Sequence, residues 1–110
     1  MTTALRVGIM DNMQATELAR GRIVYSVRSF AELILWRLPK PLPGSTHPFK
    51  YRLAFVVDGQ CVLRYDNESG KGDHRHIGGK EHVYASVSPE KLVADFKRDI
   101  ARWNHENSDS

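Results

Sequence analysis

The sequence predicts an α+β domain: an antiparallel sheet of four or five strands built from hairpins, with one C-terminal amphipathic helix packed on a face. Apolar and polar residues alternate from Tyr51 to Val57, and Asp58-Gly59 is a strong signal for a two-residue hairpin turn. The segment from Cys61 to Tyr65 then returns as the next strand. Near the C-terminus, apolar residues recur at helical spacing: Leu92, Val93, Phe96, Ile100 and Trp103.

The N-terminal part contributes two further strands. Residues 1–20 are weakly patterned, and predict at most a short strand around Val7 and a short helix ending at Arg20. Residues 22–27 are rich in β-branched and aromatic side chains and predict a strand. Residues 30–38 form an apolar run typical of a strand covered on both faces. Prolines at alternate positions then predict an extended arm over residues 39–45, because proline cannot donate to a sheet.

The second half completes the domain. Alternation puts Cys61, Leu63 and Tyr65 on the core face of their strand, and both tryptophans, Trp36 and Trp103, are expected in the core. Residues 67–80 are polar and glycine-rich and predict a loop, followed by a short last strand over residues 82–85. The helix is expected from Pro89 to Trp103, with Ser88 as its N-cap. Its pairs Asp95–Arg98 and Asp99–Arg102 are expected on the solvent side, and residues 104–110 form a frayed tail.

Composition is that of one soluble globular domain spanning residues 1–110. Apolar residues make up 41% and charged residues 26%, and no apolar run approaches the roughly 20 residues that cross a bilayer. The single cysteine and the absence of a signal-peptide pattern favour the cytoplasm. Residues 1–57 hold eight basic and three acidic side chains, whereas residues 58–110 hold eight and ten. A basic first half allows a phosphate-bearing partner but does not require one.

The densest group of reactive side chains lies in the polar loop. In extended backbone, His74 and His76 present both rings on one side, about 6.5 Å apart at the backbone. A histidine pair can supply one base and one acid near neutral pH, which is what cleavage of RNA beside its 2′-hydroxyl needs. Cations would stabilise the charge that builds on phosphorus. The side chains assigned to phosphate are Lys71, Arg75 and Arg64, and those assigned to positioning are Asp66, Asn67 and Asp73.

Two other interpretations of the histidines remain open. Imidazoles at this spacing could bind a metal ion, with Asp73, Asp66 or His82 as a third ligand, although no second pair has zinc-site spacing. Equally, both could be ordinary polar side chains of a loop. Gly70-Lys71-Gly72 lacks the spacing of a nucleotide-binding phosphate loop. Arg64 and Asp66 should share a strand face and form an ion pair, and Tyr65 should lie in the core.

The sequence resembles the TumE-type toxin family of bacterial toxin–antitoxin systems over about residues 30–100. The string from Arg64 to Asn67 followed by Gly70-Lys71-Gly72-Asp73-His74-Arg75-His76 carries most of the resemblance. The other matching segments are Trp36-Arg37-Leu38-Pro39, Lys50-Tyr51-Arg52-Leu53, Tyr84 and Leu92-Val93-Ala94-Asp95-Phe96.

The resemblance implies the toxin of a type II toxin–antitoxin pair, neutralised by direct binding of a helix-turn-helix antitoxin. By analogy with other small toxins, it implies a ribonuclease that needs no cofactor. The alternatives are a non-enzymatic inhibitor that binds RNA, the ribosome or a protein, and a metal-dependent hydrolase. A free sheet edge also makes a homodimer an open expectation.

Overall fold

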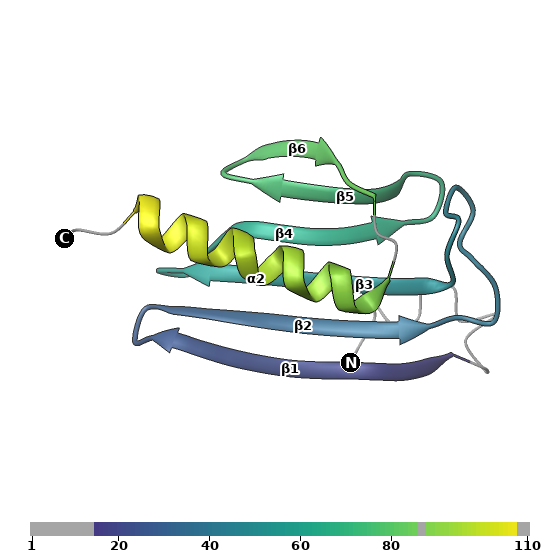
Figure 1. The fold of residues 1–110 in the computed structure, drawn as a ribbon, viewed down its shortest axis with the longest axis horizontal. Helices are drawn as coiled ribbons and strands as arrows, with labels where there is room; N and C mark the ends of the chain where they lie inside the picture. The colour runs from purple at the N-terminus through teal and green to yellow at the C-terminus, as the bar shows by residue number, and fades with distance from the viewer. Residues whose placement is uncertain (1–14, 86–87, 108–110) are drawn as a thin grey trace.

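A computed structural model describes residues 15–85 and 88–107. The chain forms an antiparallel meander of six strands in the order β1 to β6, with helix α2 lying across one face (Figure 1). The strands are β1 (Thr16–Ser26), β2 (Ser29–Arg37), β3 (Phe49–Val57), β4 (Gln60–Glu68), β5 (Gly72–Ile77) and β6 (Lys80–Val83), and the helix is α2 (Pro89–Glu106). The α+β architecture with a C-terminal helix is therefore confirmed.

The sheet has more strands than the sequence predicted, within the described residues. The glycine-rich segment predicted as a loop contains β5, and β4 continues through Glu68. The prediction failed because every residue of β5 is half-buried, so the segment lacks the apolar–polar alternation that marks a strand. Residues 16–20 belong to β1, so the helix predicted to end at Arg20 is wrong there; the strand predicted around Val7 lies outside the described residues.

Tight turns connect neighbouring strands and fix their register. Asp58 and Gly59 both have positive φ angles, 50° and 78°, as a two-residue turn between twisted strands requires. Gly78 and Gly79 do the same between β5 and β6, at 55° and 87°. The predicted arm between β2 and β3 is also present, and it closes where the Leu38 amide donates to the Pro48 carbonyl at 2.7 Å.

The hydrophobic core lies between α2 and the middle of the sheet. Its members, all at most 5% exposed, are Ala31, Leu35, Tyr51, Leu53, Phe55, Leu63, Tyr65, Leu92, Phe96 and Ile100. Burying each large side chain contributes roughly 1.5–3 kcal/mol. Trp103 packs against this cluster, whereas Trp36 is half-buried on the other face of the sheet.

Cys61 is exposed, so its predicted place in the core is wrong. Phe55 pairs with Leu63, but the next residue of β3, Val56, pairs with Cys61. Val62 is the extra residue of this β-bulge, and it takes Cys61 out of the alternation followed by Leu63 and Tyr65.

Helix α2 begins and packs as its sequence dictates. The Ser88 side chain accepts a hydrogen bond from the Lys91 amide at 3.1 Å, which confirms the N-cap. The helix runs to Glu106, three residues beyond the predicted end. Asp95 and Asp99 are each only 4% exposed, so the prediction that they face solvent is wrong. The predicted pair of Asp95 with Arg98 does form, at 3.2 Å. Both aspartates also accept from tyrosines: Tyr84 donates to Asp95 and Tyr65 to Asp99.

Candidate functional site

Strands β4 and β5 bring four of the predicted site residues together. In the register of this pair, His74 lies opposite Asp66 and His76 opposite Arg64. Directly paired residues of antiparallel strands project from the same face of a sheet. Tyr65, between Arg64 and Asp66, points into the core beneath α2. His74, His76, Arg64 and Asp66 therefore share the face opposite α2, and we call these four residues the histidine patch.

His74 is the most constrained member of the histidine patch. Its Nδ1 lies 2.5 Å from Oε2 of Glu81 on β6, and its side chain is 13% exposed. Both ring nitrogens of His74 are buried, and neither forms a hydrogen bond with the described residues. The Glu81 carboxylate lies at ion-pair distance from Nδ1, so it is the group placed to orient the ring.

A cation accompanies the two histidines. The Nε atom of Arg64 lies 3.2 Å from Oδ2 of Asp66, which confirms the expected ion pair across one pleat. This pair holds the guanidinium beside His76, its partner in the register. Lys71 lies in the turn between β4 and β5; its side chain is 60% exposed, and its ammonium is 3.7 Å from Glu68.

The remaining predicted residues lie on the α2 face of the sheet. Arg75 points beneath the helix, where its Nη1 is 3.4 Å from Oδ2 of Asp99. Asn67 is fully buried: its side chain accepts from the Tyr51 amide at 3.1 Å and donates to the Phe49 carbonyl at 2.6 Å. The sheet therefore separates Arg75 and Asn67 from the histidines, and Asn67 joins β4 to β3.

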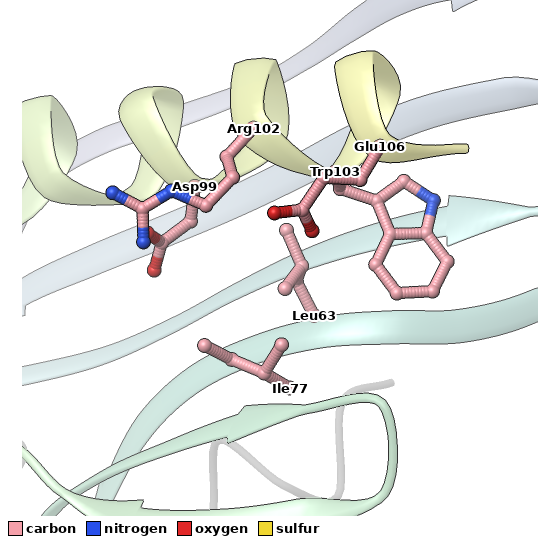
Figure 2. Close-up of a pocket in the computed structure, with 6 residues that line it drawn as sticks. All are labelled: Leu63, Ile77, Asp99, Arg102, Trp103 and Glu106. Carbon is pink, nitrogen blue, oxygen red and sulfur yellow. The ribbon is translucent and has the colours of Figure 1, made fainter. Parts of the chain in front are cut away.

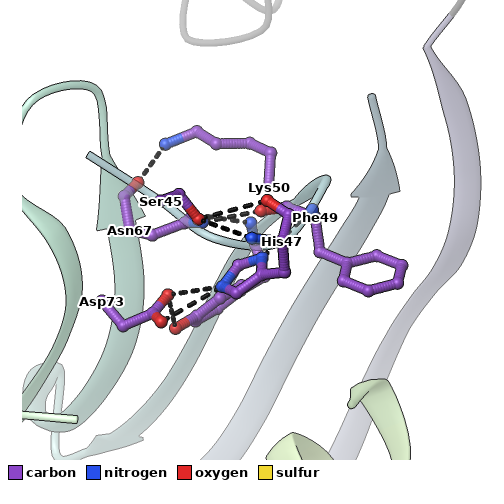
Figure 3. Close-up of polar contacts among 7 residues, drawn as sticks. Ser45, His47, Phe49, Lys50, Asn67 and Asp73 are labelled. Atoms are coloured by element: carbon purple, nitrogen blue, oxygen red, sulfur yellow. Dashed lines mark hydrogen bonds and ion pairs between the residues drawn. The ribbon is translucent and has the colours of Figure 1, made fainter. Parts of the chain in front are cut away.

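Asp73 belongs to a second cluster, which joins the arm to the start of β5 (Figure 3). Its carboxylate oxygens lie 3.0 and 3.1 Å from Nε2 of His47, and Oδ1 also accepts from the Tyr51 hydroxyl at 2.7 Å. Nδ1 of His47 accepts from the Phe49 amide, so Nε2 carries the proton toward Asp73. Burial and the hydrogen bond to Asp73 raise the pKa of Tyr51 far above its ordinary value. These contacts hold Asp73 in place, and Asp73 is the residue immediately before His74.

Sequence reasoning missed Glu81, His47 and Arg52. Glu81 follows Gly78-Gly79, a two-residue turn signal that would have placed it opposite His76 and beside His74. Arg52 lies opposite Asp66 in the register and so adjoins the histidine patch. It is exposed, and it takes part in none of the ion pairs that the described residues form. The partnership of His47 with Asp73 spans 26 residues and leaves no local signal.

A small pocket lies elsewhere, between α2 and strands β4 and β5 (Figure 2). It is lined by Leu63, Ile77, Asp99, Arg102, Trp103 and Glu106 and has a volume of about 40 Å³. That space suits water rather than a nucleotide, and none of its lining residues belongs to the histidine patch. In residues 15–85 and 88–107, no three His, Cys, Asp or Glu side chains are grouped so that they could hold a metal ion. Nor is any described helix long and apolar enough to cross a membrane.

Comparison with known proteins assigns the chain to a family. No curated protein and no solved structure matches it. One family model matches residues 6–104, nearly the whole chain, and its description is Toxin TumE. Such a toxin is a component of a toxin–antitoxin system and has an antitoxin as its partner. The meander sheet, the C-terminal helix and the histidine patch thus occur in a chain that belongs to the TumE toxin family.

Proposed function

We propose that this toxin is a metal-independent endoribonuclease whose acid–base pair is His74 and His76. The observation that carries the proposal is the register of β4 and β5, in which both histidines share a face with Arg64 and Asp66. An imidazole held by a carboxylate, a second imidazole two residues away and an adjacent guanidinium are the groups that cleavage beside a 2′-hydroxyl requires.

The mechanism assigns one proton transfer to each histidine. One of the two imidazoles takes the proton of the 2′-hydroxyl, and the resulting oxygen attacks the adjacent phosphorus. The bond from phosphorus to the 5′-oxygen breaks, and the other imidazole gives its proton to that oxygen. The products are a 2′,3′-cyclic phosphate and a 5′-hydroxyl. Arg64 stabilises the negative charge on the phosphoryl oxygens, while Glu81 holds the ring of His74.

The experiment compares three histidines in the purified protein. His74→Ala and His76→Ala should each lower the rate of RNA cleavage by roughly 10²–10⁴-fold in buffer containing a chelator. His82→Ala is the matched control, because His82 is an exposed histidine of β6 on the α2 face, and it should cleave at the parental rate. Parental rates in the His74 and His76 variants would contradict the proposal. Cleavage that stops with chelator and returns with a divalent metal would support the metal-dependent hydrolase instead.

A non-enzymatic inhibitor is the second candidate, and the exposed apolar side chains of the first hairpin favour it. Leu18, Val24, Tyr25 and Val27 are 40–101% exposed. Exposed apolar groups beside arginines are typical of a protein-binding surface. Such an inhibitor saturates at one molecule per target, whereas a nuclease acts at far lower ratios. Charge reversal at Arg20, Arg22 and Arg28 would then impair growth arrest more than the histidine variants do.

We also propose a helix-turn-helix protein as the antitoxin. The family supports an antitoxin partner in general, and the resemblance drawn from the sequence supports this class. Co-expression with the product of the adjacent reading frame should restore growth and give a complex that co-purifies. Size-exclusion chromatography of the toxin alone then tests whether the free sheet edges form a homodimer.

A further inference from the structure

The cations near the histidine patch differ in how they are engaged. Arg64 is paired with Asp66. Lys50 lies two residues before Arg52 on β3, and its ammonium donates to the Asn67 carbonyl. Burial lowers the pKa of Lys50. The side chain of Arg52 is exposed and forms no hydrogen bond or ion pair within residues 15–85 and 88–107. Arg52 can therefore bind a further anionic group without giving up a contact within the described residues.

The rows of paired residues extend from the histidine patch toward β1. One row runs through His74, Asp66, Arg52 and Ile34, and the neighbouring row on β3 and β2 pairs Lys50 with Trp36. Strands are spaced about 4.8 Å apart, so the backbone of Arg52 lies roughly 10 Å from that of His74. At this separation the long side chain of Arg52 can bind a phosphate next to the one that is cut, on the β3 side of the histidines.

Trp36 adds an aromatic surface beside Arg52. It is half-buried on the face opposite α2, and its indole N–H is buried without a hydrogen-bond acceptor among the described residues. Aromatic side chains bind unpaired bases by stacking, with a contribution of about 1–3 kcal/mol per base. A base in a duplex is already stacked on its neighbours and cannot use such a surface.

We propose that the substrate is single-stranded RNA that crosses from the histidine patch over β3 to β2. Arg52 binds the phosphate adjacent to the scissile one, and Trp36 stacks on an unpaired base of the same strand. This inference rests on the proposed function, because it extends that site and names its substrate class. It makes Arg52 and Trp36 substrate-binding residues that act mainly on KM, whereas the histidines act on kcat.

The test measures binding and cleavage separately. The binding probe is a fluorescein-labelled, random-sequence, single-stranded 12-mer RNA with 2′-O-methyl groups, which removes the attacking hydroxyl. The parent should bind this probe more tightly than a 12-base-pair duplex. Arg52→Ala should weaken binding about tenfold. It should also make the negative slope of the logarithm of the association constant against the logarithm of the salt concentration shallower by about 0.7. Trp36→Ala should weaken binding roughly 5- to 100-fold.

Matched controls make the result specific. Arg37→Ala removes an exposed arginine next to Trp36 on β2 but on the α2 face, and it should bind like the parent. Thermal unfolding checks that Trp36→Ala is folded, and Trp36→Phe should recover part of the affinity. Equal binding of duplex and single strand, or parental affinity and salt slope in Arg52→Ala, overturns the inference.

The two proposals fail in different ways. Binding that depends on Arg52 and Trp36, without any cleavage of unmodified RNA, would overturn the proposed nuclease and support the RNA path. Cleavage that depends on His74 and His76, with parental KM in Arg52→Ala and Trp36→Ala, would support the nuclease and overturn the RNA path.

Discussion

At the scale of single residues, the carboxylate beside His74 gives that ring one defined orientation. Glu81 lies 2.5 Å from Nδ1, so its carboxylate is placed to orient the imidazole. Glu81→Gln keeps the size of the side chain but removes the negative charge beside Nδ1, so it weakens the interaction that orients the ring. We predict that kcat for RNA cleavage falls roughly tenfold or more, because part of the acid–base contribution is lost.

The matched control for Glu81→Gln is Glu68→Gln. Glu68 is an exposed residue of β4, and its carboxylate lies 3.7 Å from the ammonium of the exposed Lys71. Its variant should keep the parental kcat in the same assay. If Glu81→Gln and Glu68→Gln cleave RNA equally fast, Glu81 has no role in orienting His74.

Asp95 is a residue whose ionisation stabilises the fold. Burial opposes its ionisation, but hydrogen bonds from Lys91 and Tyr84 outweigh burial and lower the pKa of Asp95 below its ordinary value. A carboxyl group whose pKa is lowered by folding stabilises the protein above its unfolded pKa, and this stabilisation is lost as the pH falls through the folded pKa. We predict that the free energy of unfolding decreases with acid below about pH 4.

Asp95→Asn should remove part of that pH dependence. The variant should lower the free energy of unfolding at pH 7 by about 1–3 kcal/mol, because hydrogen bonds to a charged group are lost. Urea unfolding at pH 7 and pH 3 measures both effects. An equal loss of stability at the two pH values would mean that the charge of Asp95 contributes nothing.

The alternation of side chains along a strand was enough to predict some features of the site from the sequence, but not others. The shared face of His74 and His76 and the ion pair of Arg64 with Asp66 depend only on extended backbone, so sequence reasoning reached them. The same period sends Arg75 to the opposite face, but this follows only once β5 is recognised as a strand. Treating residues 67–80 as a loop therefore grouped side chains that the sheet separates.

At the scale of elements, close backbone contacts hold the arm against the turn between β4 and β5. The Gly70 amide donates to the Pro43 carbonyl at 2.7 Å. Gly44 has a φ of 86°, and a Cβ placed on it would lie 3.3 Å from the Gly70 carbonyl carbon. We predict that Gly44→Ala lowers the free energy of unfolding by about 1–2 kcal/mol, because a left-handed backbone disfavours a side chain.

Gly21→Ala is the control for Gly44→Ala. Gly21 lies in β1 without a positive φ, and a Cβ there would meet nothing within 4 Å. In urea unfolding this variant should be as stable as the parent or slightly more stable, since alanine restricts the unfolded chain. Equal losses in both variants would show that the contact between the arm and the turn does not stabilise the fold.

The elements that were predicted correctly from the sequence contain local signals of their secondary structure. Helix α2 has a cap, a proline at its start and a helical apolar period, and the β3–β4 hairpin has Asp58-Gly59 between alternating strands. The bulge that exposes Cys61 has no such signal, because its position depends on the pairing of β4 with β3. Tertiary pairing likewise determines that β5 is a strand, since four of its six residues are polar and it begins at a glycine.

At the scale of the whole molecule, the polar residues on the two faces of the sheet have different roles. On the α2 face, Tyr65, Asp99 and Arg75 form contacts that hold the helix to the sheet. The register places the histidine patch on the opposite face of the sheet from α2 (Figure 1). One strand thus contributes stability through Arg75 and, in the proposed function, chemistry through His74 and His76.

The chemical ends of the RNA fragments test the central claim most directly. If two histidines transfer protons while the 2′-oxygen attacks phosphorus, the purified toxin releases fragments with 2′,3′-cyclic phosphate and 5′-hydroxyl ends. A 2′-deoxy nucleotide at the cut position should then abolish cleavage there. Fragments with 3′-hydroxyl and 5′-phosphate ends, or undiminished cleavage at the deoxy position, would contradict the account, because either result requires a nucleophile other than the 2′-oxygen.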